Sequence, residues 1–175
     1  MSVVTRWTVC DSLTIVIPTL MKHLLALSSA LLALTAAGFA KTGWTDNYEK
    51  GLEQAKKEKK LALVDFTGSD WCSWCMKLDK EVFSEAKFKE YAKQNLVLIE
   101  VDFPRMKPLS RPKQKKNDEL KAQYGITGFP SVIILDSDGN KVGKLGYRPG
   151  GAEAFIAEIE KLKGGASPAP PAASN

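Results

Sequence analysis

The sequence is poor in cysteine and histidine. Its 175 residues contain three cysteines and one histidine. Three cysteines are too few for a small fold held together by disulfides, and they cannot supply a four-cysteine zinc or iron–sulfur site. The composition is otherwise ordinary, with 44% hydrophobic and 26% charged residues. The chain can therefore bury a core, and we expect one compact domain.

The N-terminal segment indicates export. From Met21 a short basic start leads into an apolar run, and Gly38 and Ala40 place small residues at the −3 and −1 positions of a cut after Ala40. We expect a cleaved signal peptide at 21–40, preceded by an N-terminal extension at 1–20, and a periplasmic location. The alternative is an uncleaved membrane anchor, which needs about 20 apolar residues. The run here is shorter, so we expect no stable membrane insertion after cleavage.

Export would make the shortage of thiols and imidazoles more severe. Cys10 and His23 would leave with residues 1–40, so the mature chain would keep only Cys72 and Cys75 and no histidine. The same cut removes two basic residues and one acidic residue, which lowers the net charge from +5 to +4.

Ten of the remaining basic residues lie in two clusters without interleaved aromatic side chains. This pattern favours solvated faces over a nucleic-acid interface, so we expect no nucleic-acid partner. The clusters are Lys56, Lys57, Lys59 and Lys60, and Arg105, Lys107, Arg111, Lys113, Lys115 and Lys116.

Hydrophobic spacing predicts alternating helices and strands. A strand–helix–strand start requires a parallel pair, and the Asp-Gly turn of a later hairpin adds antiparallel strands. The interpretation is a three-layer α/β domain over 41–163, with a central mixed sheet flanked by helices on both faces. The expected helices are 46–60, 76–83, 84–93, 118–124 and 152–162, the strands are 61–66, 96–101, 131–135 and 141–145, the long loop is 102–116, and the flexible Pro/Ala-rich tail is 164–175.

The strongest chemical signal is Trp71-Cys72-Ser73-Trp74-Cys75, which stands between an apolar strand and an amphipathic helix. A helix N-terminus carries partial positive charge and free N–H groups, which stabilise a thiolate on the first cysteine and lower its pKa. Cys72 is therefore the expected nucleophile. Cys75, one turn further and expected to be more buried, would attack the mixed disulfide and release the product.

Three other interpretations of this cysteine pair are possible. A structural disulfide that closes so short a loop gains little chain entropy. A zinc site would need two further ligands, and only carboxylates remain for that role in the mature chain. Two thiolates could hold a Cu(I) ion with Met76 as a neighbour. Redox exchange is the favoured interpretation, and we expect no bound metal.

Together with these cysteines, three more segments resemble the thioredoxin family. They are Val64-Asp65-Phe66 before the motif, Tyr124 to Ser131 with its Gly128-Phe129-Pro130, and Gly146 after the hairpin. The resemblance covers about 44–163 and implies the thioredoxin fold, redox activity at Cys72 and Cys75, and no bound cofactor.

The resemblance also implies further site residues. Pro130 would be cis beside Cys72, and the backbone of Phe129 would pair with an extended substrate peptide. Asp65 matches the family's buried carboxylate, whose raised pKa suits it to take the proton from Cys75. The alternative for Asp65 is a partly exposed residue at a strand end.

An apolar rim for protein substrates is implied as well. Trp71, Trp74 and Phe129 would form this rim, although Trp71 could instead pack as core. The partners would then be protein thiols and disulfides and an upstream redox protein, and we expect a monomer.

The sequence departs from the plain thioredoxin pattern at three places. Asp65 lies seven residues before Cys72, one more than in typical thioredoxin, which makes Asp70 a rival carboxylate. No histidine lies between the cysteines, which favours a reductant over an oxidant. The loop at 102–116 is an insertion. The sequence also resembles exported bacterial thioredoxin-like proteins and the thioredoxin-like domain of thiol:disulfide interchange proteins.

We therefore expect an exported thiol–disulfide oxidoreductase that leans toward reduction. The alternatives are a soft-metal carrier for copper and a redox-inactive domain that binds partners through the same fold.

Overall fold

The computed structural model describes residues 41–164, which contain a five-stranded sheet and its covering helices. The strands are β1 (Trp44–Thr45), β2 (Leu61–Thr67), β3 (Leu96–Asp102), β4 (Ser131–Leu135) and β5 (Lys141–Leu145). The helices are α2 (Tyr48–Glu58), α3 (Ser73–Leu78), the π-helical turn η2 (Asp79–Phe83), α4 (Ala86–Asn95), α5 (Arg111–Gln123) and α6 (Gly151–Gly164).

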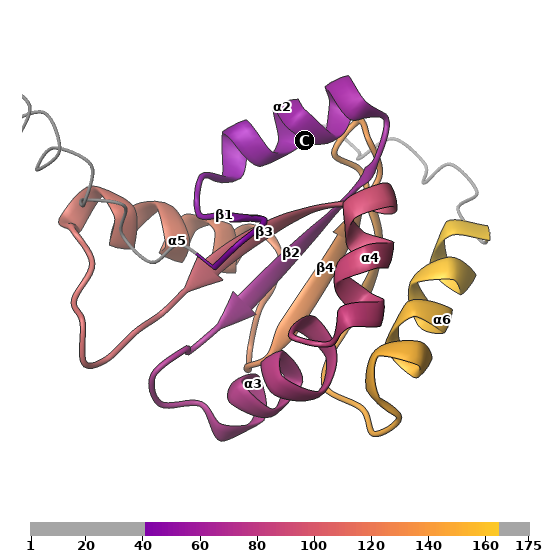
Figure 1. Ribbon diagram of the computed structural model, residues 1–175. Coiled ribbons are helices and arrows are strands. Elements are labelled where there is room, and N and C mark those ends of the chain that lie inside the picture. The colour runs from indigo at the N-terminus through magenta and orange to yellow at the C-terminus, as the bar shows by residue number, and fades with distance from the viewer. Residues whose placement is uncertain (1–40, 165–175) are drawn as a thin grey trace, which may run out of the picture. The chain divides into compact units, whose positions relative to one another are not determined.

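The sheet is mixed, with the order β1-β3-β2-β4-β5 (Figure 1). Strands β1, β3 and β2 run parallel, whereas β4 and β5 are antiparallel to their neighbours. Strand β2 lies in the centre, and all but its first residue are buried. A strand that is covered on both faces needs a nearly continuous apolar run, and the segment Leu-Ala-Leu-Val-Asp-Phe-Thr meets this need except at Asp65.

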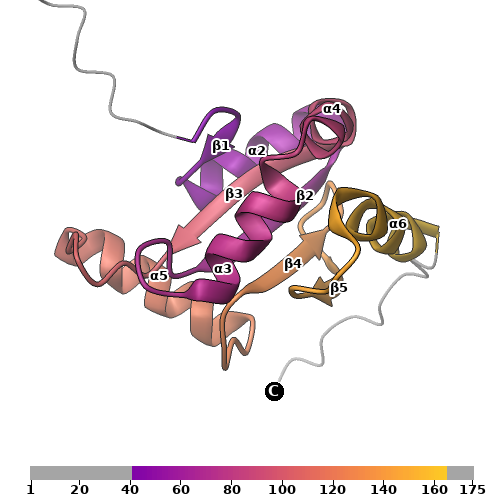
Figure 2. The same ribbon diagram turned by 60° about the horizontal axis from the view of Figure 1, so that its bottom comes forward.

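Helices cover both faces of the sheet, as expected (Figures 1 and 2). Leu63 packs in one core cluster with residues of α3, η2, α4 and α6, whereas Val64 packs in a second cluster with residues of α2 and α5. Successive side chains of a strand point to opposite faces. Asp65, two residues after Leu63, therefore faces the layer that contains α3.

The predicted hairpin is present. Strands β4 and β5 are joined by a tight turn in which Gly139 has φ of +86°, the left-handed region that glycine adopts without strain. The Asp136 carboxylate accepts hydrogen bonds from the backbone N–H groups of Asp138 and Asn140, both at 2.9 Å. Local turn chemistry is sufficient to place this element from sequence.

The predicted loop over 102–116 is wrong in its second half, because α5 begins at Arg111 instead of residue 118. Pro112 lies in the first turn, where a helix needs no N–H donor. Only Asn117 and Leu120 of this helix are buried, so the sequence shows almost no apolar periodicity. The Asn117 side chain instead donates a hydrogen bond to the backbone carbonyl of Asp102, at 2.8 Å.

Smaller differences concern element ends. The short strand β1 was not expected, the helix expected from residue 76 starts at Ser73 and becomes π-helical at Asp79, and α6 includes Gly164. Residues 1–40 and 165–175 lie outside the described part of the chain, so the extension, signal peptide and tail remain predictions. Among residues 41–164, no helix combines the length and apolar character that a membrane crossing requires.

Candidate active site

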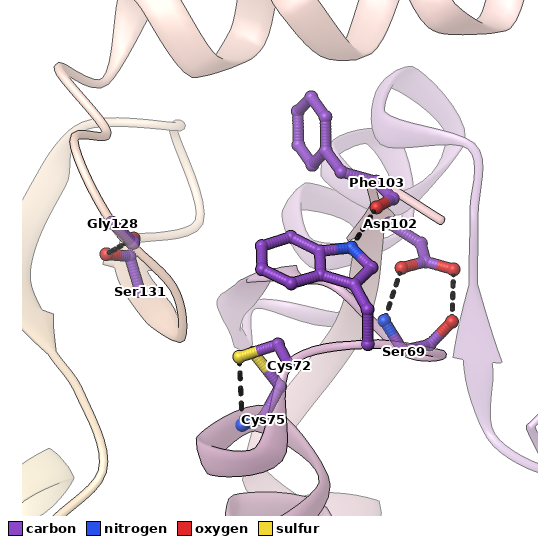
Figure 3. The surroundings of a disulfide bond; sticks show 8 residues. Ser69, Cys72, Cys75, Asp102, Phe103, Gly128 and Ser131 are labelled. Atoms are coloured by element: carbon purple, nitrogen blue, oxygen red, sulfur yellow. Dashed lines mark hydrogen bonds between the residues drawn. A yellow bond between two sulfur atoms is a disulfide. The ribbon is translucent and has the colours of Figure 1, made fainter. Parts of the chain in front are cut away.

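Cys72 and Cys75 form a disulfide at the start of α3 (Figure 3). Cys72 has extended backbone angles and is the N-cap residue, and its Sγ accepts a hydrogen bond from the backbone N–H of Cys75 at 3.2 Å. The cap position directs the Cys75 backbone N–H at this sulfur, and a sulfur at a helix N-terminus is in an environment that stabilises a thiolate. The expected difference in burial is small, since Cys72 is 7% and Cys75 is 4% exposed.

The segment that leads into the disulfide is tied to the end of β3. Ser69 donates to the Asp102 carboxylate from its backbone N–H at 2.9 Å and from its hydroxyl at 2.6 Å (Figure 3). The backbone N–H of Cys72 donates to the Gly68 carbonyl at 2.9 Å. A Cβ atom at Gly68 would lie 2.5 Å from the Trp71 ring, so only glycine lets the indole pack over this turn.

Beneath α3 lies a pocket of about 770 Å³ whose lining includes both Asp65 and Cys75. Asp65 is only 3% exposed, and its Oδ1 has no hydrogen-bond partner within the described residues. Burial raises the pKa of Asp65 to about 7; the positive charge of Lys41 opposes this rise, and Glu100 and Asp79 add to it. The structure thus places the predicted carboxylate in the pocket that reaches Cys75, and not at an exposed strand end.

Asp70, the rival carboxylate, lies elsewhere. It accepts hydrogen bonds from the backbone N–H groups of Arg105 at 2.9 Å and Met106 at 2.7 Å. These bonds, led by the one from Arg105, lower the pKa of Asp70. Asp70 therefore holds the loop at 103–110 in place, and its surroundings do not suit a proton acceptor for Cys75.

The predicted aromatic rim is divided into two parts. Trp71 contacts Phe129 edge to face, with ring centroids 5.8 Å apart, and donates from Nε1 to the Phe103 carbonyl at 2.7 Å. Trp74 is 55% exposed and packs instead against Tyr147, at 5.2 Å between centroids. Trp71 and Phe129 thus come together as expected, and Trp74 belongs to a separate aromatic pair.

Phe103 and Tyr147 were missed by the sequence reasoning. Phe103 lies 5.2 Å from Phe129 between ring centroids, and the Tyr147 hydroxyl donates to Glu81 at 2.7 Å. Neither residue belongs to a recognisable motif. Their positions, directly after β3 and shortly after β5, are the only sequence signal that could have indicated them.

The segment before β4 lies across from the disulfide (Figure 3). The Phe129–Pro130 peptide bond is cis. The Ser131 hydroxyl donates to the Gly128 carbonyl at 2.8 Å, which closes the turn around Pro130. The site thus has a sulfur pair on one side and a turn with a constrained backbone on the other. Within residues 41–164, no group of three or more His, Cys, Asp or Glu side chains is arranged to hold a metal ion.

The sequence profile of the thioredoxin-like domain matches residues 48–163. The chain belongs to this family. Disulfide bond reductase DsbH of Chlamydia pneumoniae is 37% identical over 115 residues, which cover 66% of this chain and 69% of DsbH. A solved structure described as DsbH oxidoreductase superposes with a TM-score of 0.63 at 33% identity and covers 73% of this chain and 91% of that one.

A more distant relative is thiol:disulfide interchange protein DsbD of Haemophilus influenzae strain PittGG. It is 28% identical over 111 residues, which cover 62% of this chain and only 17% of DsbD. The chain is thus a thioredoxin-like thiol:disulfide oxidoreductase, similar to DsbH and to a small part of DsbD, and it carries the Cys-x-x-Cys pair at Cys72 and Cys75.

Proposed function

We propose that this protein is an exported disulfide reductase that acts on protein substrates through Cys72 and Cys75. The observation that carries the proposal is the Cys72 sulfur at the N-cap of α3, hydrogen-bonded to the Cys75 N–H. This position stabilises an attacking thiolate without help from histidine. The similarity to a protein named disulfide bond reductase supports the direction of the reaction.

The reaction begins with the reduced pair. The Cys72 thiolate attacks one sulfur of the substrate disulfide, a Cys72–substrate S–S bond forms, and the substrate S–S bond breaks. The departing sulfur leaves as a thiolate and takes a proton from water. The Cys75 thiolate then attacks Cys72 Sγ, forms the intramolecular disulfide and releases the second substrate thiolate. Two electrons pass from the protein dithiol to the substrate, and an upstream dithiol protein must return them.

The second step requires that Cys75 lose its proton, and Asp65 is the proposed acceptor. Asp65 and Cys75 line one pocket, and the Asp65 pKa of about 7 suits a group that exchanges a proton near neutral pH. The free Oδ1 atom leaves room on the carboxylate for that exchange. Water in the pocket would connect the two side chains where they do not touch.

The substrate peptide would bind at the turn before β4. The backbone of Phe129 is proposed to pair with an extended peptide, and Pro130 would keep that backbone facing Cys72. Trp71 and Phe129 offer one apolar surface near the sulfur pair, and Trp74 with Tyr147 offers a second, separate one. The chain needs no bound cofactor in this scheme and is proposed to act as a monomer.

Trapping experiments test the assignment of the two cysteines. Cys75→Ser should accumulate mixed disulfides with substrate through Cys72, because the resolving thiol is missing. Cys72→Ser should trap almost none. Equal trapping by both variants would contradict the roles. Ser73→Ala is a matched control at an exposed position between the cysteines and should behave as wild type.

The direction of the reaction has its own test. Equilibration of the pair with glutathione should give a reduction potential near −270 mV, the range of a thioredoxin-type reductant. A potential near −120 mV, typical of a strong oxidant, would contradict the proposed direction.

The location has a simple test as well. The mature protein isolated from cells should begin at Lys41 and reside in the periplasm. A mature chain that retains residues 21–40 and fractionates with membranes would favour the anchor instead.

A further inference from the structure

Two cations lie over the aromatic side chains beside Cys72. The Arg105 guanidinium lies 3.8 Å above the Trp71 ring, measured to the ring centroid. Lys121 Nζ lies 5.7 Å from the centroid of Phe103 and 5.6 Å from that of Phe129. Both cations therefore cover the same aromatic group, Trp71, Phe103 and Phe129, which flanks the sulfur pair on one side.

The fold holds Arg105 in this position. The Asp70 carboxylate accepts hydrogen bonds from the backbone N–H groups of Arg105 and Met106, so the start of the loop at 103–110 is fixed to the segment just before Trp71. Each oxygen atom of the Asp70 carboxylate accepts one of these hydrogen bonds. The Arg105 guanidinium lies over the Trp71 ring as a cation–π contact, and such a contact leaves guanidinium N–H groups available for other hydrogen bonds.

No carboxylate within residues 41–164 forms an ion pair with Arg105 or Lys121. The nearby acidic residues of α5 have other contacts, since Glu119 pairs with Lys115 and Asp118 accepts from Gln114. Lys107 and Arg111, exposed in and just after the same loop, add positive charge without an ion pair in the described chain.

The second aromatic pair, Trp74 and Tyr147, lacks this excess. There Lys77 lies 5.3 Å from the Trp74 ring centroid and 5.1 Å from that of Tyr147. Glu81 lies 3.9 Å from Lys77 Nζ and accepts a hydrogen bond from Tyr147, so its negative charge offsets the cation. Two similar aromatic surfaces therefore differ in their charge.

We propose that the side formed by Trp71, Arg105 and Lys121 selects substrates that carry an acidic side chain close to their disulfide cysteine. This inference rests on the proposed function and names the class of substrate for that same site. The Arg105 guanidinium can bind a carboxylate by two hydrogen bonds while it remains over the indole. Lys121 supplies a second charge to the same segment of peptide.

The size of the preference follows from the exposure of these groups. Exposed ion pairs are weak, so each contact should change the reaction rate only a few-fold, and the two together should change it about tenfold. Because both contacts are electrostatic, the preference should shrink as salt rises above about 0.15 M.

The test uses the reduced full-length protein and three disulfide peptides that differ only beside the cysteine, with aspartate, asparagine or lysine. The second-order rate of Cys72–Cys75 oxidation should be about tenfold higher for the aspartate peptide than for the lysine peptide, with the asparagine peptide between them. In the double variant Arg105→Gln/Lys121→Gln, the three peptides should react at similar rates. In the charge-conserving variant Arg105→Lys/Lys121→Arg, the three rates should keep the wild-type ranking.

A control variant separates the local effect from net charge. Lys50→Gln/Lys57→Gln removes the same charge from exposed positions on α2 and should keep the wild-type preference. Equal rates for the aspartate and lysine peptides would overturn the inference, and so would an unchanged preference in Arg105→Gln/Lys121→Gln. Hydroxyethyl disulfide, which is small and neutral, reports on the proposed function alone: if it is reduced while the peptides show no order, only the inference fails, whereas failure of all substrates refutes both.

Discussion

The two sides of the active-site helix α3 differ in character. Beneath the helix, the pocket beside Cys75 contains the buried Asp65, and its lining also includes Glu100, Asp79 and three lysines. The surface beside Cys72 is aromatic and carries Arg105, which has no ion pair within residues 41–164. A buried acidic group suits proton exchange, and an open aromatic and basic surface suits a peptide. Under the proposed function, one short helix would separate proton transfer at Asp65 from substrate binding beside Cys72.

The largest expected effect concerns the attacking sulfur atom of Cys72. Cys72→Ser should lower disulfide reductase activity more than about a thousandfold, because the hydroxyl is a far weaker nucleophile than the thiolate. Turnover with a disulfide peptide measures this loss. Activity within tenfold of wild type would show that the attacking group lies elsewhere.

The next effect concerns the contribution of Asp65 to the free energy of unfolding. The folded pKa of Asp65, about 7, lies above its ordinary value of 3.8. As the pH rises, the unfolded chain therefore loses the Asp65 proton at a lower pH than the folded chain does. The protonated Asp65 carboxyl thus stabilises the folded state fully below about pH 4, and this stabilisation is lost as the pH rises to 7. Asp65→Asn should abolish this loss and raise the free energy of unfolding at pH 8 by up to about 4 kcal/mol relative to wild type.

Chemical denaturation at pH 4 and pH 8 measures this difference for oxidised wild type and Asp65→Asn. The gain should be much smaller at pH 4 than at pH 8. A gain that does not depend on pH would show that Asp65 is not the group responsible.

A smaller effect is expected at Gly68, in the turn that precedes Cys72. Gly68→Ala should lower the free energy of unfolding by about 1 to 3 kcal/mol, because its Cβ would overlap the Trp71 ring at 2.5 Å. Gly128→Ala is a matched control, since its Cβ would meet no atom within 4 Å. Equal stabilities of the two variants by urea unfolding would contradict the packing argument.

The smallest expected effect concerns Lys41, the cation that shares a pocket with Asp65. Lys41 forms an ion pair with Asp79, lies over the Trp44 and Phe83 rings, and lowers the pKa of Asp65. Lys41→Met keeps the aliphatic stem and removes the charge, so the Asp65 pKa should rise by roughly half a unit. Lys41→Arg should leave it unchanged. Titration of the Asp65 carboxyl by NMR measures the shift, and a fall in the methionine variant would contradict this role.

Much of this arrangement could be predicted from sequence, because several signals are local. The apolar run of β2, the Asp-Gly turn of the hairpin and the Cys-x-x-Cys pair each occupy a few consecutive residues. The sequence predicts too late a start for helix α5, because this helix buries only Asn117 and Leu120 and shows little apolar periodicity. Hydrophobic spacing cannot reveal a helix whose contacts are mostly polar.

The candidate site was predicted less completely than the fold. The positions of Cys72, Cys75 and Asp65 followed from motifs, but Arg105 and Phe103 reach the site from a loop more than thirty residues away along the chain. Their contacts depend on the tertiary structure that brings Asp70 to that loop. The division between Trp71 and Trp74 likewise depends on which side of α3 each indole packs.

The pH dependence of the resolving step tests most directly whether Asp65 accepts the proton of Cys75. A mixed disulfide between Cys72 and a chromogenic thiol can be formed, and release of that thiol by Cys75 can be timed from pH 5 to 9. In wild type the rate should rise through about pH 7 as Asp65 ionises. In Asp65→Asn the rate should lack this inflection and be about a hundredfold lower at pH 8. Identical profiles for the two proteins would contradict a role for Asp65 in deprotonating Cys75.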